Sequence, residues 1–386
     1  AALAAAEAVG ARVESARLSE GARRGEPGRY ARIRLRRGRA LLAVAGPVAP
    51  LGAEEADAFL VSALLWYVRG AGEARGLWLA VPEGLSAAVC ERVALLRAGL
   101  REAVSVFEVG ADGAGLTKVR APSLRELLAR PAPRLPRPAP AGVSGLAARV
   151  VALAPDAVDV VRARRGETLR FRGLPFARVR RVTGREQLWF GVGPDRERRL
   201  LDGSNEAGLL KLVSELAEHR HADAADRAHA FYRAAPEAWL ESLLRGDVSR
   251  LDPGLRLAPL HAQLRTPHAS GGARPVDLLA LRRDGRLVVI ELKVSEDAAH
   301  ALQGADYWRR VAAHHRAGHV RRSRLFGDAG ISDSPPLVYL VAPLLRFHRS
   351  LQTLARCLTP EIEIYRFDLN EDWRAGVRVM RRCELT

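Results

Sequence analysis

Two runs of apolar residues stand within residues 275–294, on either side of an Asp-Gly pair. The pattern predicts a β-hairpin, because apolar runs separated by Asp-Gly are the strongest short-range hairpin signal. Three ionisable residues interrupt it: Asp277 near the start of the first run, and Glu291 and Lys293 at the end of the second. Buried strands rarely carry ionisable groups that have no function, so this hairpin is the most informative stretch of the chain.

Ahead of the hairpin, the N-terminal third alternates predicted strands and helices, which indicates an α/β domain over residues 1–121. The expected elements are a short helix and a loop over 1–28, two strands around Arg37-Gly38 within 29–46, a helix over 54–67, a strand over 77–81, a helix over 86–100 and a strand over 103–109.

Prolines separated by arginines fill residues 122–145 and mark a domain boundary. Their density argues against helix and packed sheet, and it predicts a semi-rigid linker with polyproline character. The next segment, 146–229, predicts a small β-rich middle domain followed by a helix. Its expected elements are strands over 150–153, 158–163, 168–171, 177–182 and 187–192, and a helix over 205–218.

Arginine alternates with apolar residues along these middle strands, which places several guanidinium groups on one face of the expected sheet. Two interpretations stay open: a surface that follows nucleic-acid phosphates, and a solvated face in an arginine-rich protein. The residues concerned are Arg162, Arg164, Arg165, Arg170, Arg172, Arg178, Arg180 and Arg181.

The C-terminal segment, 230–386, predicts a domain built around the hairpin. Pro236 is well placed to open a helix. The other expected elements are a strand over 255–264, the hairpin, a helix over 297–315, a loop over 318–335, a strand over 337–341, a helix over 344–357 and a strand over 362–367. This order predicts a mixed sheet flanked by helices.

Composition adds a weak indication of a polyanionic partner. The 386 residues carry a formal net charge of +17, but Arg outnumbers Lys so strongly that codon bias explains part of this excess. Lysine is therefore informative where it occurs, and Lys293 suggests a site that needs a compact ammonium. The three scattered cysteines form neither a disulfide framework nor a zinc motif. We expect a cytoplasmic protein with no membrane segment.

The chemistry of the hairpin predicts its turn. Glu291 and Lys293 are two residues apart on a strand and share a face. A two-residue turn would pair Asp277 with Leu292, on the wrong face. A three-residue turn closed by Gly285 at positive φ puts Asp277 directly opposite Glu291.

Two adjacent carboxylates repel each other unless a cation lies between them, and hard oxygen ligands suit Mg²⁺ or Mn²⁺. Such an ion keeps several waters and binds phosphate oxygens. A neighbouring ammonium can orient an attacking water, help to deprotonate it and stabilise charge on the phosphate. The three residues therefore predict metal-assisted hydrolysis of phosphodiester bonds.

The residues Pro275, Asp277, Glu291 and Lys293 resemble the motif of the PD-(D/E)xK nuclease superfamily, which has the restriction-endonuclease-like fold. The order of elements over about 230–370 is most similar to the catalytic domain of NucS-type endonucleases. The DNA-binding N-terminal domain of that family is not recognisable here, so its mismatch substrate does not carry over.

The resemblance implies a role for each motif residue. Asp277, Glu291 and the backbone carbonyl of Leu292 would hold the metal, and Lys293 would serve the water. Glu237 would be the outer acid, with Glu241 one helical turn away as the alternative, and Gln303 would support the site.

The first domain has an order of expected elements similar to that of the last. Aligning Gly38-Arg39 with Gly285-Arg286 places Asp277, Glu291 and Lys293 on Ala31, Val44 and Gly46, which cannot bind a metal. We consider two hypotheses for 29–110: a nuclease-like fold without catalytic groups, retained for DNA contact or pairing, and an unrelated α/β domain. A different strand order would contradict the first.

The sequence favours a Mg²⁺-dependent endonuclease that acts on DNA. The alternatives are a non-catalytic nucleic-acid-binding protein on the same fold and an interaction protein with no nucleic-acid role. Substrate structure and oligomeric state, a dimer included, stay open.

Overall fold

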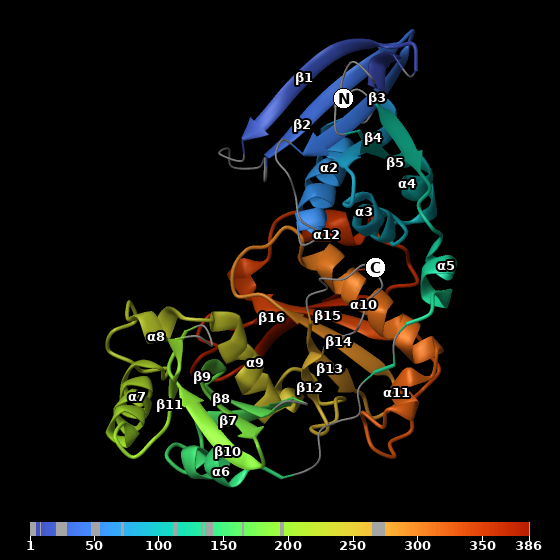
Figure 1. The fold of residues 1–386 in the computed structure, drawn as a ribbon. Helices are drawn as coiled ribbons and strands as arrows, with labels where there is room; N and C mark the ends of the chain where they lie inside the picture. The colour runs from blue at the N-terminus through green and yellow to red at the C-terminus, as the bar shows by residue number, and fades with distance from the viewer. Residues whose placement is uncertain are drawn as a thin grey trace.

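The structure is a computed structural model that describes the chain except residues 1–4, 8, 21–28, 48–54, 71–72, 111–114, 133, 136–141, 164–165, 194–196, 265–274 and 386. It contains three sheets with helices packed on them (Figure 1), which confirms the predicted α/β class. In these described residues, no helix has the length and apolar character needed to cross a membrane.

The C-terminal sheet is mixed and surrounds the predicted hairpin. In order it consists of β12 (His261–Leu264), β13 (Val276–Leu281), β14 (Leu287–Leu292), β15 (Leu337–Pro343), β16 (Ile364–Leu369) and β17 (Val379–Glu384). The central pairs β14–β15 and β15–β16 are parallel, and the outer pairs are antiparallel. Within the expected strand over 255–264, only β12 is a strand, and Leu255 makes an isolated bridge to Arg282.

Helices cover both faces of this sheet, which explains why β14 and β15 are buried along their whole length. On one face lies α9 (Pro236–Gly246), with Trp239 and Leu240 in the core. On the other lies α10 (His300–Arg316), the crossover between β14 and β15. The helix expected over 344–357 is two short pieces, η4 (Leu344–Arg346) and α12 (Leu351–Ala355), and α11 (His319–Arg322) lies in the expected loop.

The N-terminal sheet has the same order and the same strand directions as the C-terminal sheet. It consists of β1 (Arg12–Glu20), β2 (Arg29–Arg37), β3 (Ala40–Pro47), β4 (Ala74–Pro82), β5 (Val104–Val109) and β6 (Leu116–Val119). Again only the third, fourth and fifth strands pair in parallel. Helix α2 (Ala56–Gly70) makes the first crossover, as α10 does, and α3 (Ser86–Val93) and α4 (Ala98–Ala103) make the second. The strand order expected for a nuclease-like repeat is therefore present.

The residue-by-residue alignment of the two hairpins was wrong by one position. The closing pairs are Arg37–Ala40 in the first and Arg282–Arg286 in the second, so the turns hold two and three residues. Counted from these pairs, the N-terminal positions equivalent to Asp277, Glu291 and Lys293 are Arg32, Ala45 and Pro47. The sequence alignment places them at Ala31, Val44 and Gly46. The parallel neighbours agree, because Ala45 pairs with Leu79 of β4 as Glu291 pairs with Leu340 of β15.

The middle domain is a five-stranded antiparallel sheet, of β7 (Val158–Ala163), β8 (Gly166–Phe171), β9 (Leu174–Val182), β10 (Arg185–Phe190) and β11 (Arg199–Leu200). Helices α6 (Gly145–Val151) and α7 (Glu206–His219) pack on one face. The prediction of a strand over 150–153 is wrong. Helix α6 ends at Val151, its N-terminus is capped by Ser144, and its Val150 is buried.

Two further predictions from the sequence are wrong. Residues 12–20 form strand β1, not a loop, because they pair with β2. The expected linker contains helix α5 (Leu124–Ala129), which Ser123 and Glu126 begin with a reciprocal capping box. Leucines of α5 are buried, and the helix packs beside α10. Prolines flank this helix without entering it. Residues 133 and 136–141 of the linker lie outside the described residues.

Candidate active site

The hairpin has the turn that its chemistry predicts. The Gly285 amide donates to the Arg282 carbonyl at 3.0 Å, and Gly285 has a φ of +85°. A Cβ atom there would lie 2.8 Å from the Gly330 carbonyl oxygen, so the position requires glycine. Leu278 pairs with Ile290, which sets Asp277 opposite Glu291 in the next pair. The predicted three-residue turn and register are confirmed.

The two carboxyl groups meet beside Lys293 at the end of β14. The Lys293 ammonium donates to Glu291 Oε1 at 2.6 Å, and the Leu292 amide donates to Asp277 Oδ2 at 2.9 Å. Glu291 has no exposed surface, and its Oε2 is buried without a hydrogen bond to any described residue. A buried carboxylate oxygen without a partner is unusual, because its desolvation is not compensated.

The charges of the site act on each other strongly. Burial raises the pKa of Glu291 well above its ordinary value, and the charge of Asp277 raises it further. Burial lowers the pKa of Lys293, but the negative charges around it, Glu291 first, outweigh burial and raise that pKa above its ordinary value. Lys293 is therefore an ammonium in this arrangement, and the acids that raise its pKa are Glu291, Glu237 and Asp277.

Helix α9 brings a third carboxyl group. Pro236 occupies the first turn, and Glu237 follows it. Burial raises the pKa of Glu237, and the charge of Asp277 also raises it, whereas the charge of Lys293 lowers it. Glu237 is therefore close enough to interact with the charged residues of the hairpin. Glu241 is also buried, but it forms an ion pair with Arg170 of the middle sheet at 2.9 Å.

A buried arginine fixes the start of α9. The guanidinium of Arg220, with no exposed surface, donates to the carbonyls of Phe231 at 2.6 Å, Ala234 at 2.7 Å and Phe171 at 3.0 Å. Its centre lies 4.7 Å from the Trp239 ring. Burial lowers the pKa of Arg220 to about 9. Arg220 thus ties the segment before Glu237 to the middle sheet. Sequence reasoning missed it, because its partners are backbone groups far along the chain.

Helix α10 supports the hairpin from the other side. Gln303 is buried and donates to the Tyr307 hydroxyl at 2.9 Å. His300 is buried, and its Nε2 lies 3.2 Å from the Glu291 carbonyl oxygen. Burial, helped by the charge of Lys293, lowers the pKa of His300 to about 3, so its ring is neutral. His300 is a supporting contact that the sequence pattern did not single out.

A cavity of about 740 Å³ brings together the predicted residues except Glu291, which is fully buried and does not line it. Glu237, Glu241, Asp277, Leu292, Lys293 and Gln303 line it. Glu371, Trp373 and Arg374 also line it. There the Arg374 guanidinium lies 4.3 Å from the Trp373 ring. The cavity is therefore lined by acids, one ammonium and an arginine–aromatic stack.

The donor set suits one hard cation. Across the described part of the chain, no three His, Cys, Asp or Glu side chains are grouped to bind a metal. The site has two facing carboxylates and a backbone carbonyl, which is the smaller set that the sequence predicts for Mg²⁺ or Mn²⁺. The unpartnered Oε2 of Glu291 fits such an ion.

Comparison with known proteins gives little. No family model matches the chain, and no curated protein matches it. Among solved structures, the EndoMS–dsDNA2 complex is similar at 17% identity and a TM-score of 0.22. The similarity covers 55% of this chain and 64% of that chain, so the chain spans less than two thirds of it. At this level of similarity, arguments about function depend on the site itself.

Proposed function

We propose that the protein is a metal-dependent endonuclease that hydrolyses phosphodiester bonds in DNA. One observation carries the proposal: the register of the β13–β14 hairpin sets Asp277 opposite Glu291, beside Lys293, with a buried oxygen of Glu291 left unpartnered. Burying this group of charges is unfavourable for folding. A divalent cation and a phosphate would give each of the charges a partner.

The metal would be Mg²⁺ or Mn²⁺, held by Asp277, Glu291 and the Leu292 carbonyl. When bound, such an ion neutralises charge on a phosphate oxygen and lowers the pKa of a coordinated water. Asp277 is already oriented by the Leu292 amide, so its geometry is set before any ligand arrives.

The remaining residues position water and substrate. The Lys293 ammonium lies at the cavity wall, where it can hold an attacking water and stabilise charge that develops on the phosphate. Glu237 faces the same centre from α9 and is the proposed outer acid, because Glu241 already pairs with Arg170. Gln303 lies at the cavity, hydrogen-bonded to Tyr307.

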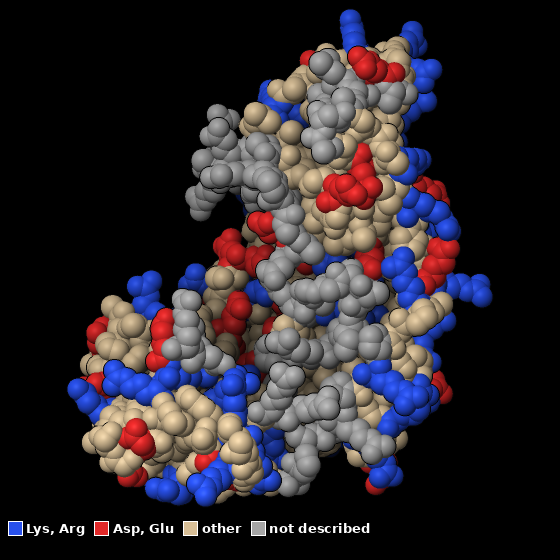
Figure 2. Space-filling model, viewed as in Figure 1, with Lys and Arg blue, Asp and Glu red and all other residues tan. Residues whose placement is uncertain are grey.

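DNA is the proposed partner because basic side chains are numerous on the middle sheet, which contacts α9 beside the cavity. The face of the middle sheet opposite α6 and α7 carries Arg170, Arg178 and Arg180, and the Arg180 guanidinium lies 5.9 Å from the Trp189 ring. Basic side chains are abundant across the middle domain, at the lower left of Figure 2. Arg170 contacts α9, so this face leads to the cavity. Arg164 and Arg165 lie outside the described residues.

The test is cleavage of labelled single-stranded, duplex and branched DNA with Mg²⁺, Mn²⁺ or EDTA. Asp277→Asn and Glu291→Gln should each lower the rate by at least about 100-fold. Asp328→Asn, at an exposed acid of the same domain, is the matched control and should cleave normally. Salt-sensitive binding without metal-dependent cleavage on any substrate would instead support a non-catalytic nucleic-acid-binding protein.

A second measurement does not depend on activity. Mn²⁺ should raise the midpoint of thermal unfolding of the wild-type protein, because a ligand that binds only the folded state stabilises it. Asp277→Asn should abolish this shift. An equal shift in both proteins would show that the cation binds elsewhere.

A further inference from the structure

The N-terminal domain is a copy of the catalytic fold from which the chemistry is missing. The two sheets share one strand order and one pattern of strand directions. At the positions of Asp277, Glu291 and Lys293, the N-terminal hairpin has Arg32, Ala45 and Pro47. Arg32 donates to Ser62 of α2 at 3.3 Å. One hairpin of the pair therefore carries the acids.

The two copies contact each other through equivalent segments. Between its fourth and fifth strands, each copy contributes one residue to an antiparallel bridge, Leu96 to Leu358. The Arg97 amide donates to the Cys357 carbonyl at 2.9 Å, and the Thr359 amide donates to the Leu95 carbonyl at 2.8 Å. This exchange of bonds is reciprocal, as expected for two like bodies related by an approximate two-fold axis.

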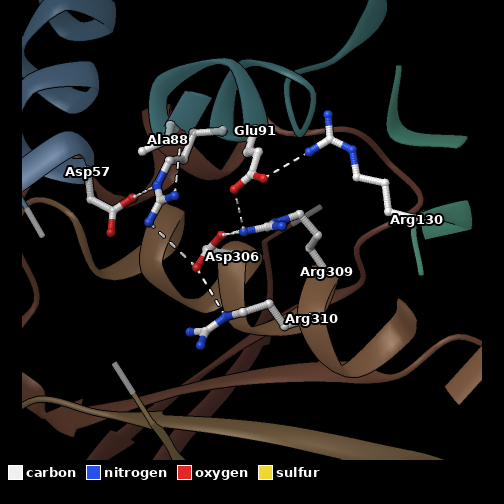
Figure 3. Close-up of polar contacts among 8 residues, drawn as sticks. Asp57, Ala88, Glu91, Arg130, Asp306, Arg309 and Arg310 are labelled. Carbon is white, nitrogen blue, oxygen red and sulfur yellow. Dashed lines mark hydrogen bonds and ion pairs between the residues drawn. The ribbon is translucent and has the colours of Figure 1, made fainter. Parts of the chain in front are cut away.

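The helices of the two copies also contact each other reciprocally. Helix α2 of the first copy packs against α10 and α12 of the second, as Figure 1 shows. In return, α3 of the first copy contacts α10, where Glu91 pairs with Arg309 at 3.3 Å and Arg92 with Asp306 at 3.6 Å (Figure 3). One apolar core runs through the contact without a break, from Phe59 to Trp308. The N-terminal copy thus covers the α10 and α12 face of the catalytic domain.

We propose that residues 12–119 serve as an inert second subunit within one chain, so that the protein acts as a monomer and cuts one strand of a duplex in each encounter. The proposal rests on the proposed function. The two strands of a duplex are antiparallel, and a protein that cuts both at once needs two reaction centres related by a two-fold axis. Here Arg32 and Ala45 stand at the positions of Asp277 and Glu291, and the body of this copy covers the α10 and α12 face of the catalytic domain.

Supercoiled plasmid DNA, incubated with Mg²⁺ and an excess of the 386-residue protein, tests how many DNA strands are cut in each encounter. Open circles should accumulate before any linear DNA, with the linear form arising at least about 10-fold more slowly, from independent second cuts. Asp277→Asn should leave the plasmid supercoiled. Linear DNA that forms without an open-circle intermediate would overturn the proposal.

Sedimentation separates this inference from the proposed function. The full chain, 42.0 kDa, should sediment as a monomer alone and as one chain per short duplex. A dimer that places two catalytic domains on one duplex would overturn the inference even if no substrate is cut. Monomers that cut no DNA would instead contradict the proposed function, and therefore also the prediction that one strand is cut in each encounter. The same result would support the pairing of the two copies within one chain.

Discussion

Replacing Asp306 with Asn should weaken the contact between the two nuclease-like copies and lower the free energy of unfolding. Asp306 lies on α10 and is 4% exposed. Its carboxylate accepts a hydrogen bond from Arg309 at 3.0 Å and pairs with Arg310 at 3.3 Å and, across the contact, with Arg92 at 3.6 Å (Figure 3). Asparagine keeps the shape of the side chain and removes its charge. Arg309 would then keep its ion pair with Glu91, and Arg92 would keep its ion pair with Asp57 at 2.6 Å.

The expected loss follows from burial. Removing one partner of a buried ion pair costs about 3–5 kcal/mol, because the remaining charge is left without compensation. That is a large part of the roughly 5–15 kcal/mol that stabilises an average domain. Burial raises the pKa of Asp306, but Arg309, Arg92 and Arg310 outweigh it and hold that pKa well below its ordinary range. The stabilisation is thus complete above the unfolded pKa, about 3.9, and is lost as the pH falls through the folded value.

Urea unfolding at pH 7 and at pH 3.5 measures this loss. Asp306→Asn should unfold at a lower urea concentration at pH 7, with a smaller difference from wild type at pH 3.5. Asp328→Asn removes an acid that is 89% exposed from an ion pair with Arg324, and it should change stability by less than about 0.5 kcal/mol. If Asp306→Asn loses less than about 1 kcal/mol, the contact between the copies does not depend on this network.

Three further substitutions test the site. Lys293→Arg should lower cleavage by at least about 100-fold with unchanged circular dichroism, because a planar guanidinium cannot replace a compact ammonium in the 8% exposed position. Gly285→Ala should lower the unfolding free energy by about 1–3 kcal/mol, measured by urea unfolding, because its φ is +85° and Gly330 lies against it. Arg220→Met should leave buried carbonyls without donors and cost about 2–4 kcal/mol by the same measurement. Equal stability of the Arg220 variant and wild type would exclude its positioning role.

The hairpin could be predicted in detail because its constraints are local. Strand alternation fixes the common face of Glu291 and Lys293, and the length of the turn decides which residue faces them. The observed three-residue turn meets that requirement. The order of strands and helices in both copies was also recoverable, since apolar runs of strand and helix length mark each element.

The errors arise where tertiary contacts override local composition. Helix α5 lies in a proline-rich segment, yet its prolines flank it and α10 buries its leucines. Strand β1 has a weak apolar pattern and owes its form to pairing with β2. Arg220 contacts backbone carbonyls of residues 48 and 49 positions earlier. No periodicity within a window of the sequence contains that information.

The two hairpins together separate what the fold requires from what chemistry requires. Ala45 and Glu291 occupy the same place in equivalent sheets, and both are buried, at 1% and 0% exposure. The fold therefore accepts a small apolar residue at this position and gains nothing from a carboxylate. A buried carboxylate with a like charge opposite it is destabilising. Within one chain, the N-terminal copy serves as an internal control: packing explains Ala45, whereas the pair of Glu291 and Asp277 is explained by the proposed metal site.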